Sequence, residues 1–372
     1  MPAPVKPWRI LVKAILLFFI LNFAFIYLYP WFSTHQIYNH IVPGRLRFSD
    51  SQPGFEQTAH ALSLYDDMDA MFALHIISAK SKPSNEFRVI FFGDSSFWGD
   101  GVSASETLPG QINSLNLRNC RDQNIVAYNL AFPTSYVMKD FLILNKALRY
   151  NPDLIVWGIT FQSLSYSNQN ALGLLSSHSD ETLYLIHHYM LNIPTDFLKP
   201  RTRWDQTLLA NRSNIKKLVI IQEDALPWMV TGVDGPLATT WQSQDNNDID
   251  PKNKYLLHSK TLNSNDLMFD VLRSADDLAH PVQILIVNEP IFIATGKNSQ
   301  QYYNIMDSRI LYDKYRSILS DWAYTNRQPY FDAWNSVPMS EFTNTPFHIS
   351  ANGEKKLASL LSPVILGLSC PR

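Results

Sequence analysis

The stretch FRVIFFGDSSFWGDG at residues 87–101 passes from an apolar run into a turn rich in glycine and aspartate. Apart from Arg88, the first six residues are β-branched or aromatic, and the run ends at Gly93, as a buried parallel strand does. Glycine permits the tight turn that follows, and Ser95 stands where the next helical segment begins. Because ligands bind at the carboxyl ends of parallel strands, we expect functional residues in this turn.

Four further apolar runs follow along the chain, separated by segments of helical periodicity such as residues 135–150 and 305–326. Strand and helix alternating in this way predict an α/β protein with a doubly wound parallel sheet. The five predicted strands are residues 87–93, 124–131, 153–161, 282–288 and 329–334.

The N-terminal segment is apolar enough to be a transmembrane helix. Residues 14–32 carry no charge, and with residues 10–12 they reach roughly the 20 residues that cross a bilayer. Lys6, Arg9 and Lys13 precede the segment, which predicts a single-pass protein with a cytoplasmic N-terminus and an extracytoplasmic C-terminal domain. A cleaved signal peptide and a buried core helix are the alternatives, but no clear A-x-A cleavage site follows.

The rest of the chain is interrupted once by a long insertion. The stretch at about residues 165–280 is too long for an ordinary connection, and its polar middle at 241–254 predicts a mobile loop. We also expect a helix from about Ala59 to Ser78. The predicted division is a cytoplasmic stub and anchor at 1–33, a juxtamembrane linker and helix at 34–86, and an α/β domain at 87–372.

Composition excludes several classes of protein. The chain has 372 residues, of which 46% are hydrophobic and 17% charged, with a formal net charge of −2. It is therefore expected to be globular, with no basic footprint for nucleic acid. Its two cysteines, Cys120 and Cys370, are too few for a disulfide scaffold or a thiolate metal site, and whether they pair is left open. No motif indicates a metal or another cofactor, and we expect none.

Ser95 by itself is either an exposed nucleophile or a simple helix cap. Its neighbours Gly93, Asp94 and Gly99 complete the pattern G-D-S-x-x-x-G, the first motif of the GDSL/SGNH hydrolases. The chain resembles this family over about residues 87–161 and 281–360. The resemblance implies a flavodoxin-like five-stranded sheet and makes Ser95 the candidate nucleophile.

The sequence FTNTPFHISANG at residues 342–353 resembles the last motif of that family, in which an acid precedes a histidine. His348 is the candidate base, because a serine hydroxyl is a weak nucleophile until an imidazole takes its proton. The acid usually lies three residues earlier, where this chain has a threonine. Asn344, one position before that, can orient the imidazole, and Asp332 and Glu289 are alternative sources of a carboxylate.

The family stabilises the tetrahedral oxyanion with donors from the nucleophile's backbone and from residues after the second and third strands. The corresponding positions here are Thr134, in place of glycine, and Thr160, in place of asparagine. Gln162 is a further candidate donor.

Two functions remain open. One is a membrane-anchored serine esterase or O-acyltransferase acting on acyl esters, including those of cell-envelope glycans. The other is a catalytically inactive SGNH-fold binding or assembly protein, since the usual acid and oxyanion asparagine are replaced. The expected partners are the membrane, through the N-terminal helix, and a membrane protein, with no nucleic acid.

Overall fold

The computed structural model describes residues 6–34, 48, 68–79, 81–166, 173–200, 202–212, 215–216, 248–252 and 261–370. Most of the loop expected at 241–254 and the first part of the helix expected at 59–78 lie outside these residues. The last part of that expected helix is two short helices, α3 (Met68–Leu74) and α4 (Ile76–Ala79).

A five-stranded parallel sheet forms the centre of the molecule, in the order β2-β1-β3-β4-β5. This is the order of flavodoxin-like sheets, so the predicted fold class is confirmed. Each strand lies within the residues predicted for it, or within one residue of them. The strands are β1 (Glu86–Phe92), β2 (Asn124–Asn129), β3 (Leu154–Ile159), β4 (Gln283–Asn288) and β5 (Tyr330–Asp332).

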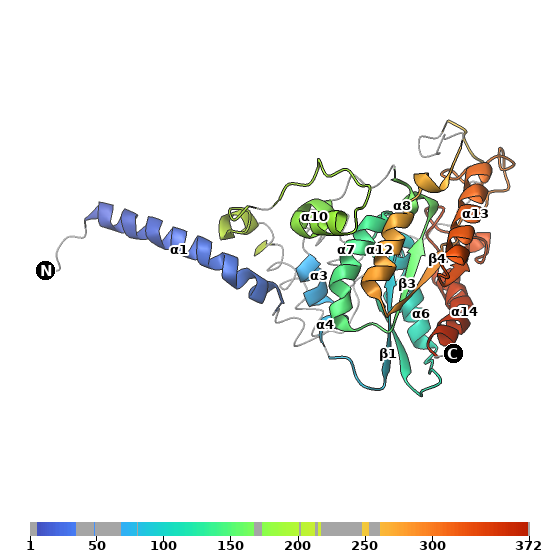
Figure 1. Cartoon of the computed structure of the whole chain (residues 1–372), viewed down its shortest axis with the longest axis horizontal. Helices are drawn as coiled ribbons and strands as arrows, with labels where there is room; N and C mark the ends of the chain where they lie inside the picture. Colours follow the sequence, from blue (N-terminus) through green and yellow to red (C-terminus); the bar gives the residue numbers. More distant parts are fainter. Residues whose placement is uncertain are drawn as a thin grey trace.

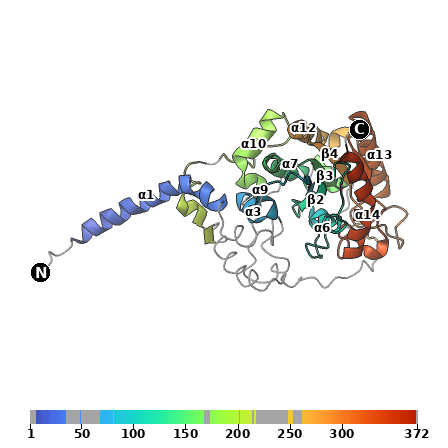
Figure 2. The same cartoon turned by 90° about the horizontal axis from the view of Figure 1, so that it is seen from below.

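Helices cover both faces of the sheet, as Figures 1 and 2 show. Alternate residues of β1 supply the two cores: Ile90 and Phe92 pack with α7, α12 and α13, whereas Val89 and Phe91 pack with α6 and α14. Burial on both faces explains why the strands are almost continuously apolar. These helices are α6 (Leu108–Ser114), α7 (Val137–Ala147), α12 (Phe269–Ala279), α13 (Arg309–Thr325) and α14 (Ala351–Leu368).

Shorter helices complete the described residues. Two of them begin directly after strands: α5 (Ser95–Trp98) follows β1 and α8 (Phe161–Leu164) follows β3. Others are η2 (Leu148–Tyr150), α9 (Gly173–Ser177), α10 (Ser179–His188), η4 (Ser264–Asp266) and η5 (Met339–Glu341), and residues 208–212 are also helical.

The C-terminus is fastened to the domain. Helix α14 packs against α6, and just beyond it Cys370 forms a disulfide with Cys120, whose Cα lies 5.7 Å away. The pairing that the sequence left open is therefore present. Because it joins residues 250 positions apart, it closes nearly the whole α/β domain into one loop.

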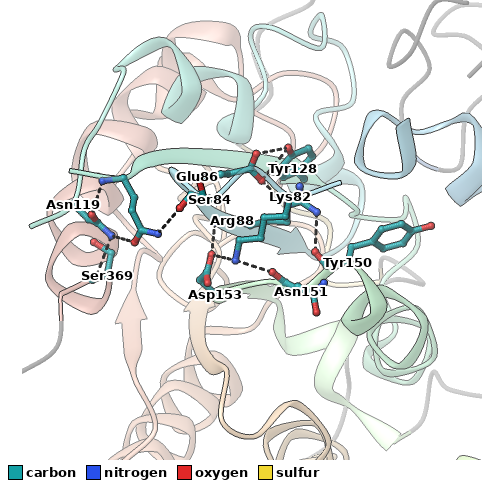
Figure 3. A network of polar contacts seen from close by, with 11 residues as sticks. Lys82, Ser84, Glu86, Arg88, Asn119, Tyr128, Tyr150, Asn151, Asp153 and Ser369 are labelled. Atoms are coloured by element: carbon teal, nitrogen blue, oxygen red, sulfur yellow. Dashed lines mark hydrogen bonds and ion pairs between the residues drawn. The ribbon is translucent and has the colours of Figure 1, made fainter. Parts of the chain in front are cut away.

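A network of charged and polar residues lies at the amino ends of the strands (Figure 3). Arg88, the charged residue in the apolar run of β1, is 2% exposed. Its guanidinium donates to Glu86 Oε1 at 2.5 Å and to the carbonyl oxygen of Tyr150 at 2.7 Å, and Lys82 pairs with Asp153 at 2.5 Å. Burial of Arg88 is tolerated because its hydrogen bonds to Glu86 and to the Tyr150 carbonyl oxygen compensate the loss of hydration.

Helix α1 (Pro7–Thr34) projects away from the α/β domain (Figures 1 and 2). Among the described residues, one helix is long and apolar enough to cross a membrane, and its apolar span is Pro7–Leu28.

Candidate active site

The turn after β1 presents Ser95 at the first position of α5. Gly93 has a φ of 155°, and a Cβ there would lie 2.8 Å from Phe97 Cβ, so the turn requires glycine. Asp94 caps α5 by accepting a hydrogen bond from the Ser96 N–H at 3.0 Å. Ser95 is half-buried, and within the described part of the chain no acceptor bonds its N–H. That N–H is one of the free donors at a helix start.

His348 reaches Ser95 from the loop before α14. Its Nε2 lies 2.7 Å from Ser95 Oγ, and the residue is 8% exposed. Thr345, at the usual position of the acid, instead shapes this loop, because its hydroxyl oxygen accepts hydrogen bonds from the N–H groups of Phe347 and His348 at 3.3 and 3.0 Å. The structure thus brings the candidate nucleophile and base together.

Two side chains meet the other ring nitrogen of His348. Asn344 Oδ1 lies 2.9 Å from Nδ1, as the sequence suggested, and Asp100 Oδ2 lies 3.0 Å from the same atom. Asp100 is not among the site residues predicted from the sequence. A carboxylate at this position stabilises an imidazolium, which the neutral amide of Asn344 does not do to the same extent.

Local backbone geometry explains how Asp100 returns to the histidine. Gly99 and Gly101 have φ values of 85° and 84°, in the left-handed region that favours glycine. Gly99 ends α5, and the N–H groups of Gly99 and Asp100 both donate to the Ser95 carbonyl oxygen, at 3.1 and 3.0 Å. An aspartate between two glycines, directly after the nucleophile's helical turn, is the signal that could have identified it.

The two alternative carboxylates lie elsewhere. Asp332 accepts a hydrogen bond from Arg316 Nη2 at 2.6 Å and another from Asn288 at 2.8 Å. Neither Asp332 nor Glu289 forms an ion pair with His348 within the described residues. The structure therefore does not place either of them as the partner of the histidine.

Glu289 lies beneath the nucleophile turn. It is 1% exposed, and a Cβ at Gly158 would lie 2.6 Å from its Oε1. The carboxyl group lies against Asp94 and Ser96 of that turn. Burial, and then the nearby charge of Asp94, raise the pKa of Glu289 well above its usual range.

A buried ion pair adjoins this carboxyl group. Lys139 Nζ pairs with Asp140 at 2.5 Å and donates to the carbonyl oxygen of Gly93 at 2.8 Å. Burial raises the pKa of Asp140 to about 7, against the opposing effect of Lys139. Trp157 Nε1 also donates to Asp140, at 3.0 Å. Because Lys139 bonds the Gly93 carbonyl oxygen, the buried ion pair holds the turn that carries Ser95 in place.

Two of the three candidate oxyanion donors hold local structure. The Thr160 hydroxyl oxygen accepts from the Ser163 N–H at 3.1 Å and the Thr160 N–H donates to Ser163 Oγ at 2.8 Å, which caps α8. The Gln162 amide donates to Asp307 at 2.8 Å, and burial raises the pKa of Asp307 to about 6. The Gln162 amide is therefore engaged as a donor, and the Thr160 hydroxyl serves as the acceptor that caps α8.

Thr134 is placed differently. Its N–H donates to the Phe132 carbonyl oxygen at 2.6 Å, but its buried hydroxyl has no partner among the described residues. The adjacent Ser135 donates to Asp94 Oδ2 at 2.9 Å, which joins the loop after β2 to the nucleophile turn. The Ser95 N–H and the Thr134 hydroxyl thus have no partner among the described residues.

The sheet order, with a serine after β1 bonded to a histidine before the last helix, defines a GDSL/SGNH hydrolase-like fold. No protein-family model and no curated protein matches the chain.

Several solved structures are similar to it. One is the carbohydrate acetylesterase family member from Sinorhizobium meliloti, with 15% identity, 76% of this chain and 98% of that chain covered, and a TM-score of 0.34. Another is the aryl esterase of M. smegmatis, with 13% identity, coverage of 76% and 99%, and a TM-score of 0.35. A third is the lipase/acylhydrolase from Enterococcus faecalis, with 11% identity, coverage of 77% and 98%, and a TM-score of 0.35.

Proposed function

We propose that the chain is a membrane-anchored serine esterase or O-acyltransferase acting on acyl esters. The observation that carries this proposal is the 2.7 Å contact between Ser95 Oγ and His348 Nε2, with Asp100 on the opposite ring nitrogen. A nucleophile, a base and a carboxylate in this order form the arrangement that activates a serine hydroxyl.

In the proposed reaction, Ser95 Oγ attacks the ester carbonyl carbon and its proton passes to His348 Nε2. Asp100 stabilises the imidazolium that forms, and His348 then returns the proton to the departing alcohol. The Ser95 N–H and the Thr134 hydroxyl donate to the oxyanion of the tetrahedral intermediate. Water releases the acyl group from Ser95 in a hydrolase, and a second alcohol accepts it in a transferase.

The proposed location is the outer face of a membrane. Helix α1 serves as the anchor, and the Cys120–Cys370 disulfide supports an oxidising compartment for the rest of the chain. Acyl esters of cell-envelope glycans are substrates within reach of a domain held in this way.

A fluorophosphonate probe tests the proposal, because it reacts with activated serines. We expect the purified full-length protein to be labelled and to hydrolyse a short-chain aryl ester, and we expect Ser95→Ala and His348→Ala to abolish both signals. Circular dichroism and thermal unfolding of the two variants serve as controls for folding. A folded wild-type protein without serine-dependent labelling or ester hydrolysis would instead support the inactive binding or assembly protein.

A further inference from the structure

One polar residue of helix α1, Asn22, is buried against the rest of the protein. Asn22 is 1% exposed, whereas its neighbours Leu21 and Phe23 are 53% and 44% exposed. Its side-chain oxygen accepts a hydrogen bond from the backbone N–H of Leu209 at 2.8 Å. The anchor helix therefore bonds directly to a segment of the insertion that lies 187 residues further along the chain.

The hydrogen bond between Leu209 and Asn22 determines where this segment of the insertion lies along the axis of α1. Asn22 comes six residues before Leu28, the end of the apolar span, which places it about 9 Å back along the helix at 1.5 Å per residue. Both views show the short helix of residues 208–212 beside the C-terminal half of α1 (Figures 1 and 2). If α1 crosses a bilayer, this short helix lies at the level of the membrane rather than above it.

The hydrogen bond also has the chemistry expected at that depth. The Leu209 N–H belongs to the first turn of its helix and has no acceptor within that helix. In water a solvent molecule would serve, but within a bilayer such a group needs a partner from the protein. The Asn22 side-chain oxygen gains a protein partner in the same bond, whereas its Nδ2 has none among the described residues.

The exposed side chains of the segment suit a lipid interface. Trp204 and Leu209 are 50% and 38% exposed, and Arg203 and Arg212 are exposed beside them. Residues 199–217 contain six basic residues and one acidic residue. Aromatic and aliphatic groups next to arginines are typical of surfaces that enter the headgroup layer and attract anionic lipids.

We propose that residues 202–212 form a membrane-contact segment, which lies at the boundary between the headgroups and the acyl chains of the bilayer that α1 crosses. The α/β domain is then held against the lipid surface at two places, the anchor and this segment. The inference rests on the proposed role of α1 as a membrane anchor.

Single cysteines test the proposal, because the described native cysteines are paired and leave an introduced thiol free for labelling. The full-length chain is placed in nanodiscs of phosphatidylcholine and phosphatidylglycerol and labelled with an environment-sensitive dye. The three positions are Ala210→Cys in the segment, Ser359→Cys on the exposed face of α14 as the matched control, and Leu17→Cys in α1. Lipids then carry a nitroxide either near the headgroup or deep in the acyl chain.

We expect the headgroup nitroxide to lower the emission at position 210 about two-fold or more, and to leave position 359 unchanged. The deep nitroxide is expected to quench position 17. Quenching at 17 with position 210 behaving like 359 overturns the membrane-contact segment while the anchor stands. No quenching at 17 overturns the anchor itself, and with it the basis of the inference.

A further outcome distinguishes lipid from protein as the occupant of this surface. If the label at position 210 is shielded from aqueous iodide but not quenched by either nitroxide, a second copy of the chain covers the segment and lipid contact is excluded. Asn22→Leu, combined with Ala210→Cys, is expected to reduce the nitroxide quenching at 210, because the segment loses its bond to α1. Unchanged quenching would contradict the role assigned to Asn22.

Discussion

One nitrogen of His348 faces both Asp100 and Asn344, at 3.0 and 2.9 Å. Only one N–H is available there, and a carboxylate is the stronger acceptor once the imidazole is protonated. We therefore expect Asp100→Asn to slow aryl-ester hydrolysis by about 10²–10⁴-fold, and Asn344→Ala by less than about tenfold. Steady-state rates of the two variants, measured side by side, check this. The opposite ranking would make Asn344 the partner that orients the histidine.

The raised pKa of the buried Glu289 predicts a pH-dependent stability. Because its pKa is raised in the folded protein, the folded state keeps a proton that the unfolded state releases, so this residue lowers stability as pH rises above about 4.5. A glutamine side chain does not titrate, so the melting temperature of Glu289→Gln relative to wild type should rise as the pH increases above about 4.5. The underlying slope is at most about 1.4 kcal/mol per pH unit. A difference that stays constant or falls as the pH increases would contradict a raised pKa for Glu289.

At the scale of the elements, α5 packs onto β3 through a contact that only glycine permits. A Cβ at Gly158 would lie 2.6 Å from Phe97 Cδ2. Gly158→Ala must displace Phe97 and with it the helical turn that begins at Ser95, at an expected cost of about 1–3 kcal/mol. Thermal or urea unfolding measures the loss, and fluorophosphonate labelling should slow in parallel.

Gly367 provides the matched control for that substitution. It lies in α14, and a Cβ there would meet no atom within 4 Å. Gly367→Ala is expected to stabilise the protein by up to about 1 kcal/mol, because alanine is the better helix former. If both variants lost similar stability, the loss at Gly158 would not come from the crowding described.

The elements differ in how well the sequence predicts them. The strands are apparent because both faces of the sheet are covered, which makes each strand an almost continuous apolar run. The extent of the last helix is less apparent, because α14 continues to Leu368 through Pro363, a residue at which helices usually break. Packing against α6 compensates the hydrogen bond that proline removes.

Site residues that belong to a sequence motif were predictable. A residue that reaches the site only through the geometry of a turn was not. Ser95 and His348 follow from strand position and motif, and the structure brings them together. Asp100 was missed because its approach depends on two positive-φ glycines rather than on any periodic pattern. Thr160 was interpreted as an oxyanion donor, but α8 begins directly after β3 and uses its hydroxyl as a cap.

At the scale of the whole molecule, the disulfide is expected to contribute substantially to stability. It links residues 250 positions apart, so its loss frees a long loop in the unfolded chain. Replacing both Cys120 and Cys370 with serine should lower the free energy of unfolding by about 2–4 kcal/mol. Urea unfolding with and without reductant checks this: reductant should weaken the wild type and leave the double variant unchanged. Equal stability of the two oxidised proteins would contradict a structural role for the bond.

Ser95 and His348 are far apart along the chain, and this separation determines when during synthesis the site can form. The two residues are 253 positions apart, and α14 and the disulfide follow the histidine. A ribosome that has completed roughly the first 300 residues has made the nucleophile and all strands but β5, but no base for the serine. We therefore expect the nascent protein to stay inert until the residues beyond His348 have been made and α14 packs against α6.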